Sequence, residues 1–142
     1  LITRSSSRVS ESTELSSNRA GAVSEHVVAI RLLKLGYTVS VPEVPCRYDL
    51  VVDLGDQLVR TQVKRGFTDS REDTLRVNLT GSVHKGGTSY ESVTYEREDI
   101  GAFAIHDPIN DRVYWLWFEE APATELRRKY NSLLAQTIDC KL

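Results

Sequence analysis

The stretch that most constrains the fold is residues 47–64, which predict two short strands joined by a tight turn at Gly55-Asp56. Side chains on a strand alternate between its two faces, so Gln62 and Lys64 lie on one face of the second strand. Asp49 lies on the first strand, near the same end of the hairpin. An acid, an amide oxygen and a lysine therefore converge, which is the arrangement that a Mg²⁺-dependent phosphodiesterase needs.

The composition is that of one globular domain with a real core: 142 residues, of which 40% are hydrophobic and 27% charged. No apolar run is long enough to span a membrane, and the Ser-rich N-terminus lacks the apolar segment of a signal peptide. Cys46 and Cys140 form no C-x-x-C pair, so we interpret them as reduced thiols of a cytoplasmic protein. A net charge of -2 argues against a protein that coats nucleic acid nonspecifically, although it does not exclude a DNA enzyme.

The first part of the chain predicts a tail followed by a helix. Residues 1–17 are polar and Ser-rich, which predicts a disordered tail and leaves residues 18–142 as the folded domain. A helix capped by Asn18 or by the serine before it follows over about residues 18–35. Apolar residues recur along it at helical spacing, and Glu25 borders that apolar face.

Strands dominate the rest of the chain. The alternation of apolar residues predicts further strands over 37–41 and 75–79, and a hairpin formed by 102–105 and 112–118. Residues 81–89, which contain two adjacent glycines, predict a mobile loop. A last helix, opened by a proline, is expected over about residues 124–135. The order helix, strands, helix predicts an α/β fold with a mixed central β-sheet flanked by helices.

Each candidate residue has a simpler explanation when it is taken alone. Asp49 could be a solvated acid before a hydrophobic run, and Lys64 could be an edge-strand lysine that opposes aggregation. Gln62 can bind Mg²⁺ through its amide oxygen but brings no charge. Glu25 could supply the missing charge, or could pair on the helix surface with His26 or an arginine. The four residues together, in this order and on these faces, weaken the simpler explanations.

In this order, a helix with Glu25, then Asp49, then Gln62-Val63-Lys64, the chain resembles the core of the PD-(D/E)xK (restriction-endonuclease-like) nucleases. The closer resemblance is to the Q-x-K subgroup found among group I intron homing endonucleases and their archaeal and bacterial relatives. It covers about residues 20–118. The resemblance implies a restriction-endonuclease-like core and a DNA endonuclease that hydrolyses phosphodiester bonds with a water activated by Mg²⁺, for which Mn²⁺ can substitute.

Carried over to this chain, the resemblance gives each residue a role. Asp49 becomes the principal metal ligand, and Gln62 stands at the family's second acidic position. The backbone carbonyl of Val63 and the carboxylate of Glu25 become further ligands, and Lys64 matches the catalytic lysine. Two positions depart from the family pattern: no proline precedes Asp49, and Gln62 leaves the site one carboxylate short.

Cations near these residues are candidates for contact with DNA. Arg60 shares the face of Gln62 and Lys64, Arg65 follows directly, and Lys85 lies in the glycine-rich segment. We predict that these three contact DNA phosphates, with ordinary solvated cations as the alternative. Cutting both strands of a duplex generally needs two active sites, so we expect a homodimer or a higher symmetric oligomer.

Three other functions are compatible with the sequence. The first is an endonuclease with the same core that resolves Holliday junctions, because loops such as 81–89 decide between duplex and branched DNA. The second is a catalytically weakened DNA-binding module, which Gln62 and the near-neutral charge favour. The third is a small protein-interaction domain. The aromatic residues at 114–118 could stack on bases but are better explained as packing of the core.

Overall fold

A long helix, α2 (Ser17–Lys34), opens the described part of the chain, which comprises residues 16–69 and 73–142 of this computed structural model. The side chain of Ser16 accepts a hydrogen bond from the Arg19 N–H at 3.3 Å, so the cap lies one residue before the earlier of the two predicted positions. After the helix, Gly36 has a φ of 95°, which favours glycine. The predicted tail lies outside the described residues, except that Ser16 and Ser17 start the helix.

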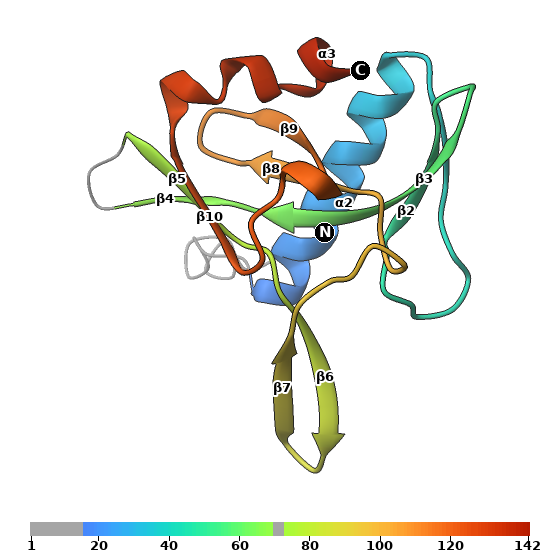
Figure 1. The fold of residues 1–142 in the computed structure, drawn as a ribbon, viewed down its shortest axis with the longest axis vertical. Helices are drawn as coiled ribbons and strands as arrows, with labels where there is room; N and C mark the ends of the chain where they lie inside the picture. The colour runs from blue at the N-terminus through green and yellow to red at the C-terminus, as the bar shows by residue number, and fades with distance from the viewer. Residues whose placement is uncertain (1–15, 70–72) are drawn as a thin grey trace, which may run out of the picture.

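The central sheet has five strands in the order β1-β2-β3-β8-β9 (Figure 1). Strands β3 and β8 are parallel, and the other neighbouring strands are antiparallel, which confirms the predicted mixed sheet. Strands β2 and β3 form the predicted hairpin around Gly55, and β8 and β9 form the second one. The strands are β1 (Thr38–Ser40), β2 (Leu50–Asp53), β3 (Leu58–Arg65), β8 (Ala102–Asp107) and β9 (Arg112–Trp117).

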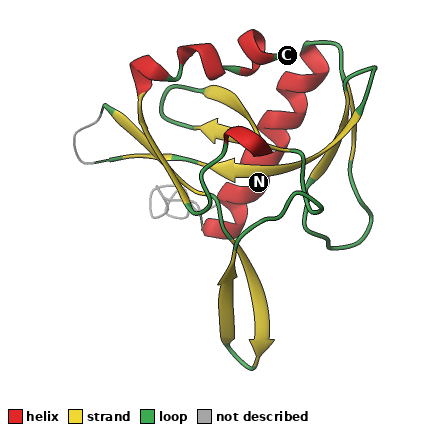
Figure 2. Ribbon diagram, in the orientation of Figure 1, coloured by secondary structure: helices red, strands yellow, loops and turns green. Residues whose placement is uncertain are grey.

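A second sheet, in the order β10-β5-β4, replaces the predicted last helix. Its strands are β4 (Phe67–Thr68), β5 (Thr74–Asn78) and β10 (Glu125–Lys129). The helix predicted over 124–135 is wrong: a strand occupies Glu125–Lys129 and only short 3-10 helices follow, although Leu126 and Leu133 are spaced as on one face of a helix. The edge of β5 offers backbone hydrogen bonds instead, and β10 pairs with it along its whole length. Short helices complete the chain (Figure 2): Phe118–Glu120, Tyr130–Ser132, Leu134–Gln136 and α3 (Ile138–Lys141).

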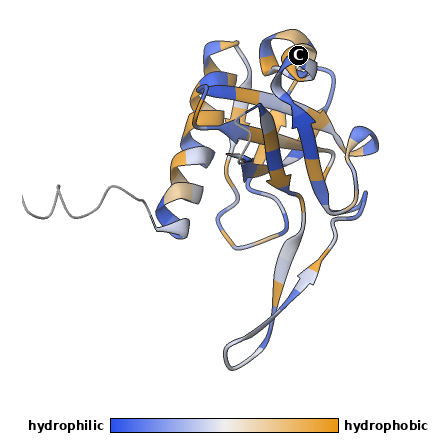
Figure 3. Ribbon diagram, turned by 90° about the vertical axis from the view of Figure 1, so that its left-hand side faces the viewer, coloured by the Kyte–Doolittle hydropathy of each residue, from blue (hydrophilic) through white to orange (hydrophobic). Residues whose placement is uncertain are grey.

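A hairpin of two strands, β6 (Gly81–Gly86) and β7 (Ser89–Val93), projects from the body of the domain (Figure 1). The prediction of a loop over 81–89 is therefore wrong. Gly86 and Gly87 have φ values of 107° and 56°, so the two glycines that suggested a loop make the tight turn of a hairpin. Figure 3 shows strongly apolar residues concentrated in the strands of the body, while this hairpin is mostly polar or of intermediate hydropathy.

The central sheet separates two apolar cores. On one face, Val28 and Leu32 of α2 pack with Val63 of β3 and with Trp115. On the other face, the second sheet packs against β8 and β9 through a group that includes Leu75, Val77, Leu126, Phe103, Ile105 and Tyr114. Tyr114 and Trp115 are fully buried, as expected of core residues. Among the described helices, none combines the length and the apolar character that crossing a membrane requires.

Candidate active site

Asp49 lies immediately before β2, just beyond the Leu50–Thr61 pair where the pairing of β2 with β3 begins. Its Oδ2 atom accepts a hydrogen bond from the Val63 N–H at 2.9 Å, and its own N–H donates to the Thr61 carbonyl at 3.0 Å. Because Leu50 pairs with Thr61 across the two antiparallel strands, Gln62 is the residue opposite Asp49. Residues opposite each other in such a pair share a face of the sheet, so the structure brings Asp49 and Gln62 together.

Glu25 reaches the same place from helix α2. The helix buries Ser24, Val28 and Leu32 against the sheet, and Glu25, next to Ser24, is half-buried. Burial, a hydrogen bond with the Asp49 carboxyl and the negative charge of Asp49 together raise the pKa of Glu25 from 4.5 to about 7. Two carboxyl groups this close cannot both ionise without cost unless a cation lies between them. The structure therefore places Glu25 beside Asp49, and its role as a metal ligand stays a prediction.

Lys64 lies on β3, two residues after Gln62 and on the same face. Its Nζ donates a hydrogen bond to the Thr80 carbonyl at 2.6 Å and lies 5.3 Å from the centre of the Tyr95 ring. Burial lowers the pKa of Lys64, the Arg47 charge lowers it as well, and the nearby Asp49 charge opposes them. The ammonium group is therefore a half-buried cation within electrostatic range of Asp49.

The donor set fits a hard divalent cation such as Mg²⁺, which needs only one or two carboxylates and keeps several waters. The N–H and C=O of one strand residue point to the same side of the strand, and the Val63 N–H points at Asp49. The Val63 carbonyl therefore faces the open edge where Asp49 lies. Within residues 16–69 and 73–142, no group of three or more acidic, histidine or cysteine side chains could hold a metal. The site consequently combines two carboxylates with an amide and a carbonyl oxygen.

The three cations predicted to contact DNA lie apart from one another. Arg60 is exposed on the face of Gln62, and its Nη1 donates to the Glu98 carbonyl at 2.7 Å. Arg65 points to the other face, where it donates to the Ala20 carbonyl and the Ser24 hydroxyl, both at 3.2 Å. Lys85 lies on the projecting hairpin and forms an ion pair with Glu91 at 2.7 Å.

Two side chains that the sequence did not single out also border the site. The Arg47 guanidinium lies over the Tyr95 ring, 4.3 Å from its centre. Strand alternation could have indicated Arg47, because it is two residues from Asp49. No comparable signal pointed to Tyr95. It follows β7 in the chain, and the base of the hairpin places it at the site.

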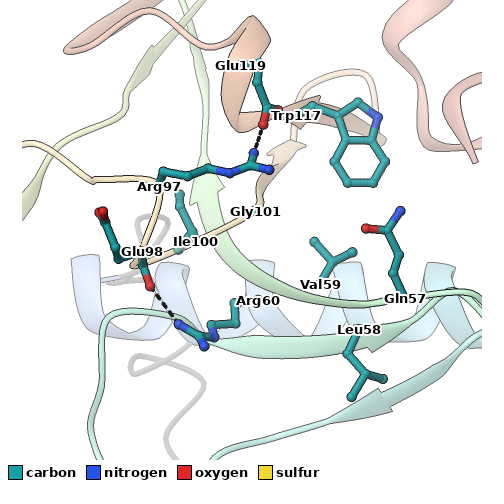
Figure 4. Close-up of a pocket in the computed structure, with 10 residues that line it drawn as sticks. All are labelled: Gln57, Leu58, Val59, Arg60, Arg97, Glu98, Ile100, Gly101, Trp117 and Glu119. Carbon is teal, nitrogen blue, oxygen red and sulfur yellow. Dashed lines mark hydrogen bonds and ion pairs between the residues drawn. The ribbon is translucent and has the colours of Figure 1, made fainter.

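One hollow on the described surface is lined by residues other than Glu25 and Asp49. It is a pocket of about 550 Å³ at the beginning of β3 and β8 (Figure 4). Arg97 forms an ion pair with Glu119 across it, and Arg60 with its hydrogen bond to Glu98 lines another part. Its wall consists of Gln57, Leu58, Val59, Arg60, Arg97, Glu98, Ile100, Gly101, Trp117 and Glu119. Of the lining residues, Arg60 is the nearest in sequence to the candidate site, two residues before Gln62 on the same face of β3.

Comparison with known proteins identifies the family and the fold. A family model described as PD-(D/E)XK endonuclease matches residues 15–134, which confirms the resemblance predicted from the sequence. The structure of a bacterial homing endonuclease, I-Ssp6803I, is similar with a TM-score of 0.69 and 19% sequence identity. The similarity covers 80% of this chain and 78% of that chain, which confirms the predicted restriction-endonuclease-like fold. No curated protein matches the chain in sequence.

Proposed function

Because the chain belongs to the PD-(D/E)XK endonuclease family, we propose that it is a Mg²⁺-dependent DNA endonuclease whose active site is formed by Glu25, Asp49, Gln62 and Lys64. One observation carries the proposal: the Asp49 carboxylate lies beside both a second carboxyl group, Glu25, and a half-buried lysine, Lys64. Carboxylates with a purely structural role usually form ion pairs with basic side chains and do not lie beside a second carboxyl group. A pair of carboxyls next to a lysine suits a metal ion and a phosphate instead.

The proposed metal ligands are the carboxylates of Asp49 and Glu25, the amide oxygen of Gln62 and the backbone carbonyl of Val63. When it is bound, Mg²⁺, or Mn²⁺ in its place, supplies an acidified water and offsets negative charge on the phosphate. The Val63 N–H holds Asp49 at 2.9 Å and so fixes the direction of its carboxylate before any metal binds. Gln62 in place of an acid lowers the negative charge of the site, which predicts weaker metal binding than a site with three carboxylates would have.

Lys64 has the position and charge to stabilise the phosphate as negative charge develops on it during hydrolysis. An ammonium group has three N–H donors, and Thr80 takes one of them. The remaining donors can reach a phosphate oxygen or orient the attacking water. Because Lys64 is partly desolvated, each of these hydrogen bonds is stronger than it would be in bulk water.

DNA is the proposed substrate, and the surface around the site offers phosphate contacts. Arg60 lines the pocket next to Gln62, and Lys85 is exposed on the hairpin whose base contacts Lys64. Arg65 is bonded to helix α2, so its contribution to DNA binding would be indirect. For cleavage of both strands we propose a homodimer or a higher symmetric oligomer, which places one such site on each strand.

The proposal is tested by incubating the protein and Mg²⁺ with supercoiled plasmid, linear duplex, single strand and a four-way junction. Asp49→Ala and Lys64→Ala are each expected to lower the cleavage rate by at least about 100-fold. Asp56→Ala and Lys129→Ala, which alter an exposed acid and an exposed lysine, are matched controls and should cleave like wild type. Cleavage that survives both site variants would show that the active site lies elsewhere.

The same panel separates the two alternatives that share the fold. Preferential cleavage of the four-way junction would identify a junction-resolving endonuclease with the same residues. Salt-dependent DNA binding without cleavage of any substrate would favour a DNA-binding module, for which the amide at Gln62 is the supporting observation.

A further inference from the structure

Arg47 is held at the site by three separate groups. Its guanidinium lies over the ring of Tyr95, with the guanidinium carbon 4.3 Å from the ring centre. Its Nη2 donates to the Thr94 carbonyl at 3.2 Å and lies 3.7 Å from Asp99 Oδ2. Thr94 and Tyr95 directly follow the hairpin strand β7, so the base of the hairpin positions this arginine.

Arg47 and Lys64 share this ring. Lys64 Nζ lies 5.3 Å from the centre of the Tyr95 ring, and the Arg47 guanidinium carbon lies 4.3 Å from the same centre. Two cations kept close together in a half-buried place repel each other, and this arrangement is stable only with enough negative charge nearby. Asp99 offers one carboxylate, in a loose contact with Arg47.

Metal binding would change this balance. A divalent cation on Glu25 and Asp49 would offset the negative charge of Asp49, which acts on Lys64. Arg47 and Lys64 then carry two positive charges against the single carboxylate of Asp99. A phosphodiester supplies the missing negative charge, and the planar guanidinium, unlike an ammonium group, matches two phosphate oxygens at once.

We propose that Arg47, held on the ring of Tyr95, contacts the phosphodiester that the enzyme cleaves. This inference rests on the proposed nuclease function and adds a substrate-contacting residue to it. Tyr95 is then a platform that fixes the direction of the guanidinium, which lies over its ring. The hairpin, through Thr80 and Tyr95, places both cations on the same phosphate.

The test compares Arg47→Ala with Arg31→Ala. Arg31 is a matched control because its side chain is 32% exposed, against 35% for Arg47, and likewise bonds a carboxylate and a backbone carbonyl, both of Asp111. Arg47→Ala is expected to lower the Mg²⁺-dependent cleavage rate by about 100-fold. With Ca²⁺, another hard cation with oxygen ligands, in place of Mg²⁺ and under conditions without cleavage, it should reduce the salt slope of DNA binding by about one. Arg31→Ala should change neither quantity.

A third variant, Arg47→Lys, keeps the positive charge but lacks the planar guanidinium. It tests the inference even if Arg47→Ala fails to fold. It should bind DNA with an unchanged salt slope but cleave about 10-fold more slowly than wild type. If wild type cleaves DNA and the Arg47 variants cleave like Arg31→Ala, the nuclease stands and this inference is overturned. If wild type cleaves no DNA, the proposed function falls and the inference falls with it.

Discussion

At the scale of single residues, the Glu25–Asp49 pair makes stability depend on pH in an unusual direction. The pKa of Glu25 is raised to about 7, so the folded protein holds this proton more tightly than the unfolded chain does. Stability from this group is complete below about pH 4.5 and is lost as pH rises to about 7. In EDTA, the free energy of unfolding of wild type, relative to Glu25→Gln, should therefore fall over this range, by at most about 1.4 kcal/mol per pH unit. Chemical denaturation at a series of pH values measures it.

Glu120→Gln provides the control with the opposite sign. Partial burial raises the pKa of Glu120, but hydrogen bonds from Lys141, the Trp117 backbone and Gln136 outweigh burial and lower it. Relative to Glu120→Gln, wild type should gain stability as pH rises through the acid range. Adding Mg²⁺ at pH 8 should stabilise wild type and Glu120→Gln but not Glu25→Gln. Equal stabilisation of all three proteins would show that Glu25 does not bind the metal.

How much of the site the sequence predicts depends on how far apart its residues lie in the chain. Asp49, Gln62 and Lys64 belong to one hairpin, so strand alternation alone places them together. Glu25 follows from the helix that packs directly on that hairpin. Tyr95 lies on the same site but depends on the fold of the whole segment between β5 and β8, and no local pattern carries that information. Strand alternation could have indicated Arg47, but it could not have indicated its partner Tyr95.

At the scale of elements, substitution by alanine should change stability in opposite directions at two glycines, Gly66 and Gly21. A Cβ at Gly66, just after β3, would lie 2.6 Å from Leu75 Cδ1 and 3.2 Å from Val77 Cγ2, both on fully buried side chains. Gly66→Ala should destabilise the protein by about 1–3 kcal/mol, because a packed core accommodates such an atom poorly. Gly21→Ala meets nothing within 4 Å on helix α2 and should stabilise it by about 0.5–1 kcal/mol.

Urea denaturation of both variants and wild type measures this pair of effects. The comparison also reports on the site, since Gly66 follows Lys64 and Arg65 directly and its N–H donates to the His106 carbonyl at 2.8 Å. If Gly66→Ala were as stable as wild type, the close packing of β5 against the end of β3 would be wrong.

The errors in predicting elements have one physical cause. Residues 124–135 contain good helix formers, yet helix propensity amounts to tenths of a kcal/mol per residue. Pairing with β5 satisfies the backbone of β10 and buries Leu126 in the second core, which outweighs that preference. The hairpin β6–β7 was hidden for a related reason. Its strands carry no clear apolar alternation, since neither face packs on the body, and only the glycine turn marked it.

At the scale of the whole molecule, a buried polar cluster joins the helix layer to the central sheet on the side away from Lys64. The Ser24 hydroxyl oxygen of α2 lies 2.9 Å from His106 Nδ1, and Arg65 of β3 donates a hydrogen bond to the same oxygen. On its other side, His106 Nε2 is 3.9 Å from Asp111, which pairs with Arg31 of α2. This cluster adds polar contacts to the apolar packing of Val28 and Leu32 that holds α2 on the sheet.

This cluster predicts that the stability of the folded protein decreases in acid. Burial lowers the pKa of His106, and the charges of Arg65 and Arg31 lower it further, against the opposing effects of Asp111 and Asp107. The unfolded chain therefore takes up a proton more readily, so stability is complete above about pH 6.5 and falls as pH decreases below it. In a Glu25→Gln background, which removes the opposing titration, His106→Gln should flatten the loss between pH 7 and pH 5. Identical pH profiles with and without His106 would show that the helix and the sheet are held together independently of this proton.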